Sequence, residues 1–194
     1  MMFEKIGGSI AVARAALLIC AVAFAAAPAA AELVNENLLV AVPDGYKVDF
    51  SEKSAKMMMQ EMVPAAENVH GWTEMVTVQI FYNFKVPLDT FRAGNEKLWG
   101  EACPHSIFND VASVTENGYP ALIWLQTCPL NSETGKPEIT FFKAIQGKDS
   151  LYLVQKAFKF QPSKQQIVTW VQYLKKVSVC DSRLPERRCP ATKD

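Results

Sequence analysis

Cysteine content is the feature that most restricts the fold of this chain. Cys20 lies in an apolar N-terminal run, and the other four of the five cysteines follow much later, at 103, 128, 180 and 189. An even number of cysteines in an exported chain is typical of disulfides, and four cysteines allow three pairings. Cys103 ends an expected helix and Cys128 ends an expected strand, whereas Cys180 and Cys189 enclose a polar segment. These positions favour Cys103–Cys128 and Cys180–Cys189, and neither pair has the spacing of a metal or redox motif.

The first 31 residues have the pattern of a cleavable export signal. Lys5 and Arg14 precede an uncharged apolar run over 15–27, and the small residues at 29–31 form a cleavage site. The run is shorter than the roughly 20 residues that a membrane-spanning helix needs. We therefore expect a signal peptide over 1–31.

Two alternatives to this signal are an uncleaved anchor and lipid attachment at Cys20. Lipid attachment needs a small residue just before the cysteine, and Ile19 occupies that position. We therefore expect one periplasmic or secreted domain over 32–194, with no membrane span after cleavage. The signal carries two basic residues and one acidic residue, so its removal changes the formal net charge from 0 to −1. Such a balance gives no electrostatic reason to expect nucleic acid as a partner.

Alternation of apolar and polar residues predicts most of the sheet. In the segment 74–84, Val76 and Val78 point to one side, whereas Thr77 and Gln79 point to the other. An apolar run over 38–42 precedes a turn at 43–45. The strands that we expect after this turn cover 46–50, 56–63, 74–84, 121–127, 139–145 and 151–160. The last three are joined by short connections and predict a three-stranded meander over 120–160.

Two helices interrupt the strands. The apolar period becomes helical over 88–103, with Leu88, Phe91, Leu98 and Trp99 on one face and Asp89 as the expected N-cap. A second helix is expected after Ser163 as its cap, and its buried stripe contains Ile167, Trp170, Val171 and Leu174. Sequential strands joined by turns, together with two helices, predict an α+β fold in which helices pack on an antiparallel sheet.

The chain also resembles the PsbP-like superfamily over roughly residues 36–178. The resemblance consists of the Val-Pro-Asp-Gly-Tyr strand end at 42–46, the middle helix, the Asn-Gly-Tyr-Pro-Ala entry to the meander at 117–121 and the closing amphipathic helix. It implies an α/β/α sandwich and, since most known members are adaptors or accessory subunits, a non-catalytic role. The superfamily has no shared catalytic motif, so the resemblance implies no catalytic residue. The segment 180–189 is not part of the pattern.

No G-x-S-x-G, H-E-x-x-H or phosphate-binding glycine-loop motif is present in this sequence. A hydrolase with a histidine base would need His70 or His105, and both lie in expected loops. The cysteines of the exported domain are expected to be oxidised and unavailable as nucleophiles. An enzyme with a site composed of distant residues remains an alternative, and no cofactor is expected.

A methionine cluster supports a second alternative, a copper-handling protein. Thioether and imidazole ligands suit Cu(I), and the candidate ligands are Met57, Met59, Met62, His70 and Met75. On a strand, neighbouring methionines point to opposite faces, so a role in packing or in a contact surface is the competing interpretation.

A polar-aromatic sheet face is the candidate binding site. Thr77, Gln79 and Phe81 share one side of a strand, and Trp124 and Gln126 share one side of another. If the two strands are neighbours, these side chains line a groove for a peptide or a small ligand. Our leading hypothesis is a non-enzymatic periplasmic binding or accessory protein, whose partner is a periplasmic protein or a small ligand.

Overall fold

The computed structural model describes residues 33–132 and 134–190, and the predicted signal over 1–31 lies outside these ranges. The described helices are α1 (Leu88–Ala102), α2 (Lys164–Lys176) and the short 3-10 helix η1 (Pro185–Arg187). The strands are β1 (Glu36–Leu39), β2 (Tyr46–Lys53), β3 (Met57–Pro64), β4 (Glu74–Tyr82), β5 (Ile107–Glu116), β6 (Tyr119–Asn131), β7 (Lys136–Gln146), β8 (Ser150–Phe158) and β9 (Ser178–Asp181). None of the described helices is both long and apolar enough to span a membrane.

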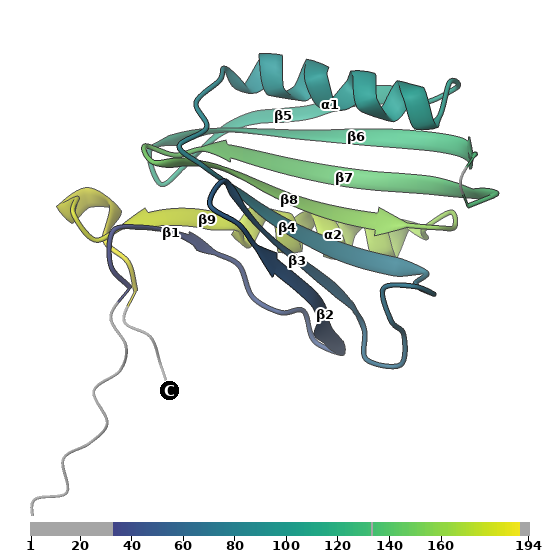
Figure 1. The fold of residues 1–194 in the computed structure, drawn as a ribbon, viewed down its shortest axis with the longest axis horizontal. Coiled ribbons are helices and arrows are strands. Elements are labelled where there is room, and N and C mark those ends of the chain that lie inside the picture. The colour runs from purple at the N-terminus through teal and green to yellow at the C-terminus, as the bar shows by residue number, and fades with distance from the viewer. Residues whose placement is uncertain (1–32, 133, 191–194) are drawn as a thin grey trace, which may run out of the picture.

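The strands form one large antiparallel sheet with a helix on each face. Its order is β2-β3-β4-β8-β7-β6-β5, and β1 pairs with β9 in a separate two-stranded ribbon. Figure 1 shows α1 along the β5–β6 side of the sheet and α2 behind the strands. The strands β6, β7 and β8 are the predicted meander, with antiparallel register between neighbours. The architecture is therefore the expected α+β sandwich.

The two faces of the sheet carry separate hydrophobic clusters, because successive strand residues point to opposite sides. Val154 of β8 and Phe141 of β7 belong to the cluster that includes Trp170 and Leu174 of α2. Leu153 and Phe142, one residue along each strand, belong to the cluster against α1. The period-two pattern in the sequence thus identifies which residues each helix covers.

Three strands, β1, β5 and β9, were not among the strands expected from the sequence. In β5, which lies at the edge of the sheet, Ile107 and Val111 are mostly exposed, and the register shifts between Asp110 and Ala112. An exposed, bulged edge strand has no clean alternation of apolar and polar residues, so local periodicity does not reveal it. The strand β9 has only four residues and depends on its pairing with β1, from the other end of the described chain.

The helix ends follow local capping chemistry. The Ser163 side chain accepts from the Gln166 backbone N–H, and the Gln166 side chain accepts from the Ser163 N–H, which forms a capping box for α2. The prediction for α1 was wrong by two residues: Pro87 is the N-cap, and Asp89 lies inside the first turn. The fixed φ of proline suits a helix start, and an acidic residue in the first turn complements the helix dipole.

A buried lysine holds α2 against the sheet. The Nζ of Lys156, on β8, lies 2.7 Å from a Glu74 carboxylate oxygen and 2.7 Å from the Tyr46 hydroxyl. It also lies 3.8 Å from the ring centre of Trp170, on α2. Burial lowers the pKa of Lys156 to about 8, while the hydrogen bond and charge of Glu74 act in the opposite direction. The Lys156 ammonium group therefore remains charged at neutral pH, and the hydrogen bond and charge of Glu74 stabilise this charged form.

A second buried lysine caps the other end of α2. Lys143, on β7, donates to the carbonyl oxygens of Leu174 at 3.0 Å and Val177 at 2.7 Å, and it pairs with Glu116 at 2.7 Å. The last carbonyls of a helix have no partner within the helix, so this ammonium group satisfies them from the sheet. Burial lowers the pKa of Lys143, and Glu116 opposes that shift.

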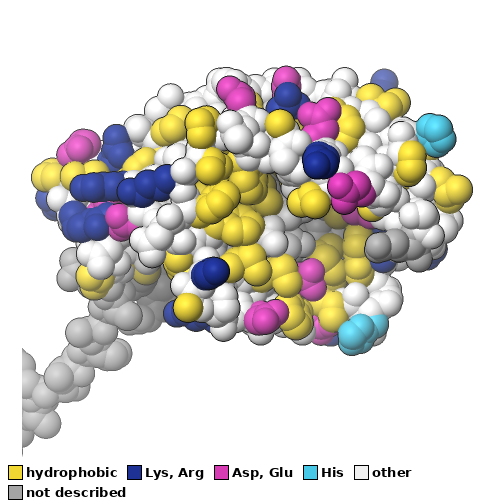
Figure 2. All heavy atoms as spheres, turned by 45° about the horizontal axis from the view of Figure 1, so that its top comes forward, with side chains coloured by type: hydrophobic (Ala, Val, Ile, Leu, Met, Phe, Trp, Pro, Cys, Tyr) yellow, Lys and Arg dark blue, Asp and Glu magenta, His cyan; other side chains and the backbone are white. Residues whose placement is uncertain are grey.

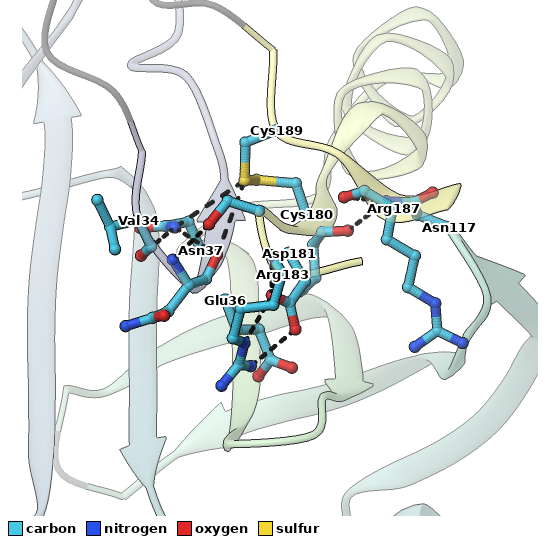
Figure 3. The surroundings of a disulfide bond; sticks show 12 residues. Val34, Glu36, Asn37, Asn117, Cys180, Asp181, Arg183, Arg187 and Cys189 are labelled. Atoms are coloured by element: carbon cyan, nitrogen blue, oxygen red, sulfur yellow. Dashed lines mark hydrogen bonds and ion pairs between the residues drawn. A yellow bond between two sulfur atoms is a disulfide. The ribbon is translucent and has the colours of Figure 1, made fainter. Parts of the chain in front are cut away.

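Both predicted disulfides are present. Cys103–Cys128 joins the end of α1 to β6 across a sequence separation of 25. Cys180–Cys189 closes the C-terminal segment across a separation of 9, and Figure 3 shows its surroundings. The first disulfide therefore fixes one end of α1 to the sheet.

Glu36, which lies near Asp181 and Arg183 in Figure 3, connects the β1–β9 ribbon to the turn between β7 and β8. Its carboxylate accepts from the backbone N–H groups of residues 148, 149 and 150 and from the Tyr152 hydroxyl. Arg183 extends this contact by pairing with Asp149 and Asp181, both at 2.7 Å. An added Cβ at position 147 would overlap the Glu36 carboxylate, so a larger residue there would displace this contact.

Candidate functional site: the α1 groove

The helix α1 covers only part of its sheet face. It rests on β6 and β7, where Trp99 meets Phe142 edge to face with ring centres 5.9 Å apart. Phe142 in turn stacks on Trp124 at 4.9 Å. On the β5 side, Arg92 pairs with Asp110 at 3.2 Å. These contacts hold the helix toward one side of the sheet, and a groove lies between α1 and the strands β4 and β8.

This groove, called the α1 groove below, has a volume of about 470 Å³. Its lining consists of Gln79, Phe81, Phe84, Val86, Thr90, Phe91, Gly94, Asn95, Leu98 and Leu153. None of these described lining residues is charged. Figure 2 shows hydrophobic side chains gathered along the middle of this face. The volume lies within the range of about 300–1,000 Å³ that is typical of small-molecule sites.

Three phenylalanines form the aromatic end of the α1 groove. The Phe81 ring centre lies 5.7 Å from that of Phe91 and 6.0 Å from that of Phe84, and the last two are 6.4 Å apart. Phe84 is 42% exposed and Leu98, on the helix wall, is 65% exposed. Water therefore reaches apolar side chains on both walls.

A row of polar side chains crosses the sheet beside these rings. Gln155 of β8 donates to Gln79 Oε1 at 3.0 Å, and Gln79 Nε2 donates to Met59 Sδ of β3 at 3.6 Å. Glu61 shares the Met59 side of β3 and pairs in register with Thr77. Burial raises the pKa of Glu61, so its surroundings disfavour a charge.

The predicted ligand-binding residues lie on one face of the sheet but are not neighbours. Thr77, Gln79 and Phe81 are on β4, and the last two line the α1 groove. Trp124 and Gln126 are on β6, and β8 and β7 separate this strand from β4. Both β6 residues are fully buried, and within the described chain Trp124 Nε1 and both Gln126 amide atoms have no hydrogen-bond partner. The predicted groove required β4 and β6 to be neighbouring strands, and they are not.

The five candidate copper ligands are divided between the two sheet faces and a loop. Met57 and Met59 share the face of β3 that carries the α1 groove, because they pair in register with Phe81 and Gln79. Met62 is buried in the cluster beneath α2, on the opposite face. Met75 is also buried, whereas His70 is exposed in the connection from β3 to β4. Met75, two residues before Thr77 on β4, lies on the same face as Met57 and Met59 but is buried, so among these candidates only Met57 and Met59 are partly accessible on that face.

The described histidines do not belong to a cluster of potential metal ligands. His70 and His105 are both exposed, as expected for loop residues. Among the residues that the structure describes, there is no group of three or more His, Cys, Asp or Glu side chains placed to hold a metal ion.

Eight lining residues of the α1 groove were not identified as site residues from the sequence, among them Phe84, Phe91, Asn95 and Leu98. Phe91 and Leu98 fit the apolar face of the expected helix, where burial is the ordinary interpretation. Leu98 is instead mostly exposed on the side of α1 that lines the groove. The breadth of the apolar face of this helix is the one sequence feature that could have indicated an incompletely covered helix side.

This chain is similar to known proteins in its fold alone. No protein-family model and no curated protein matches the sequence. Among solved structures, a mutant of the protein Mog1 is 11% identical, with 70% of this chain and 78% of that chain covered and a TM-score of 0.44. The Ran-binding protein Mog1p of Saccharomyces cerevisiae is 11% identical, with 73% and 85% covered and a TM-score of 0.42.

LpqN of Mycobacterium tuberculosis, described as involved in cell envelope biogenesis, is 10% identical, with 75% and 84% covered and a TM-score of 0.38. The likeness to these proteins is one of fold alone. Because the identities and TM-scores are low, no residue role or partner of these proteins is assigned to this chain.

Proposed function

We propose that this protein is an exported, non-enzymatic binding or accessory protein that holds an uncharged apolar ligand in the α1 groove. The observation that carries the proposal is the exposure of Phe84 and Leu98 on a groove whose described lining has no charged side chain. Clustered exposed apolar side chains are a common property of binding surfaces, because burial by a partner removes them from water. Export is supported by the signal pattern and by two disulfides, which persist in oxidising compartments.

The groove also explains why α1 is less tightly packed than α2. The helix α1 has no fully buried residue, whereas α2 buries Trp170 and Leu174. Added Cβ atoms at Gly94 and Gly100 would meet nothing within 4 Å. A helix that forms one wall of a binding groove leaves part of its apolar face for the ligand, so incomplete packing of α1 is the expected result.

Leu98→Asp is expected to weaken binding of N-phenyl-1-naphthylamine, an uncharged apolar fluorescent probe, by at least about tenfold. The reason is that probe binding would desolvate the new carboxylate without a partner. The matched control is Val168→Asp on α2, since Val168 is also an exposed apolar helix residue, at 54%. The control is expected to bind as the unmodified protein does. Equal losses in both variants, or no fluorescence increase with the unmodified protein, would contradict the proposal.

A further inference from the structure

The helix wall of the α1 groove carries an unsatisfied hydrogen-bond acceptor. Asn95 lines the groove, and its Oδ1 is buried without a hydrogen-bond partner among the described residues. A buried polar atom without a partner is unfavourable, so a native structure that retains one needs an explanation. A ligand that presents an N–H or O–H group to Asn95 would satisfy this oxygen, whereas a hydrocarbon would not.

The strand wall carries a donor that is only weakly satisfied. Gln79 lines the groove from β4, and its Oε1 is occupied by the Gln155 amide at 3.0 Å. Its Nε2 has two hydrogens, and the partner in the structure is the thioether of Met59 at 3.6 Å. Thioether sulfur is a weak acceptor, so a ligand carbonyl would be a better partner for Gln79.

The charge of the groove excludes one common class of apolar ligand. The described lining contains no cation that could pair with the head group of a fatty acid or a phospholipid. Arg92, on the same helix, is already paired with Glu96 at 3.5 Å and with Asp110 at 3.2 Å. Burial of an unpaired carboxylate or phosphate in this groove would be strongly unfavourable. The ligand group inside the groove is therefore uncharged.

An amide satisfies all of these conditions. In a trans peptide group the N–H and C=O point in opposite directions from one plane, and both require hydrogen-bond partners when buried. Asn95, whose Oδ1 lacks a partner among the described residues, lines the groove from α1, and Gln79, whose Nε2 has a thioether partner, lines it from β4. An apolar side chain next to that peptide group can enter among Phe81, Phe84 and Phe91, whose ring centres are 5.7–6.4 Å apart.

We propose that the ligand of the α1 groove is an extended, uncharged peptide segment, with one peptide group held between Asn95 and Gln79 and the adjacent apolar side chain among the three phenylalanines. This inference rests on the proposed function and names its ligand. Asn95 is a specificity residue: it selects a ligand with an N–H, whereas the phenylalanines accept any apolar group.

The test compares two synthetic probes of the same shape. One is the uncharged pentapeptide acetyl-Ala-Ala-Leu-Ala-Ala-amide, and the other has an ester in place of the peptide N–H of its leucine. Calorimetry with the unmodified protein is expected to show about threefold to tenfold tighter binding of the amide, which is the effect of one hydrogen bond to a buried partner. Asn95→Ala is expected to remove this preference. Asn109→Ala, the same substitution at an exposed residue of β5, is expected to retain it.

The outcomes separate this inference from the proposed function. Equal affinity for the amide and the ester, with N-phenyl-1-naphthylamine still bound in the α1 groove, would overturn the peptide inference and leave the proposed function intact. Equally tight binding of acetyl-leucinamide would assign the site to small amides and also overturn the peptide inference. Failure of every apolar probe, N-phenyl-1-naphthylamine included, would overturn both.

Discussion

Glu74→Ala is expected to lower the free energy of unfolding by about 3 kcal/mol, because it leaves the Lys156 ammonium group buried without its counter-charge. Lys156 is fully buried, and Glu74 lies 2.7 Å from its Nζ. Tyr46 would still accept from Lys156, at 2.7 Å, and Trp170 would still provide its ring face. A neutral hydroxyl and a ring do not replace a carboxylate. Urea denaturation of the variant and the unmodified protein measures the difference.

Removal of the charge itself is expected to restore stability. Lys156→Met keeps an apolar chain of similar length against Trp170, so we expect the double variant with Glu74→Ala to be within about 1 kcal/mol of the unmodified protein. A double variant as unstable as Glu74→Ala alone would show that Glu74 acts through another contact. The hydrogen bond that Glu74 accepts from the Tyr46 hydroxyl, at 2.8 Å, is the candidate for such a role.

Removal of the Cys103–Cys128 disulfide by double alanine substitution is expected to have the second large effect, and it connects stability to the binding site. A loop of 25 residues corresponds to a loss of about 3.5 kcal/mol in the chain-entropy model. In addition, α1 loses the covalent bond that fixes its C-terminal end, and it has no fully buried residue to replace it. We expect faster amide hydrogen exchange throughout α1 and weaker binding of N-phenyl-1-naphthylamine.

The second disulfide is the matched control for this experiment. Double alanine substitution of Cys180 and Cys189 opens a loop of 9 residues, for which the same model gives about 2.6 kcal/mol. The ribbon β1–β9 is not part of the α1 groove, so probe affinity and α1 exchange are expected to stay unchanged at temperatures where the variant is folded. Equal effects of the two disulfides on probe binding would mean that α1 does not form a wall of the site.

Sequence periodicity predicted the fold where burial is regular. The central strands β4, β6, β7 and β8 have one residue in two facing each helix, and this alternation is visible in the sequence. The edge strand β5 was missed because most of its side chains are exposed and a bulge interrupts its pattern. The ribbon β1–β9 was missed because its pairing depends on contacts distant in sequence, which local patterns do not contain.

The candidate site was predicted in part. Gln79 and Phe81 line the groove, and the alternation of β4 correctly placed them on one face. Trp124 and Gln126 share that face, but strand order is a property of the whole topology, and β8 inserts between β4 and β7. The helix residues Asn95 and Leu98 were missed because the position of α1 across the sheet decides whether they are buried, and the sequence pattern reports only the helical face.

Titration of the protein with benzyl alcohol, an uncharged and water-soluble apolar probe, tests the central claim most directly. Methyl resonances of Leu98 and Leu153, which line the α1 groove, and of Val168 and Leu174, on the α2 side, report where it binds. The α1 groove predicts saturable shifts at Leu98 and Leu153 and none at Val168 and Leu174. Shifts confined to the α2 side, or no saturable shift at Leu98 and Leu153, would contradict it.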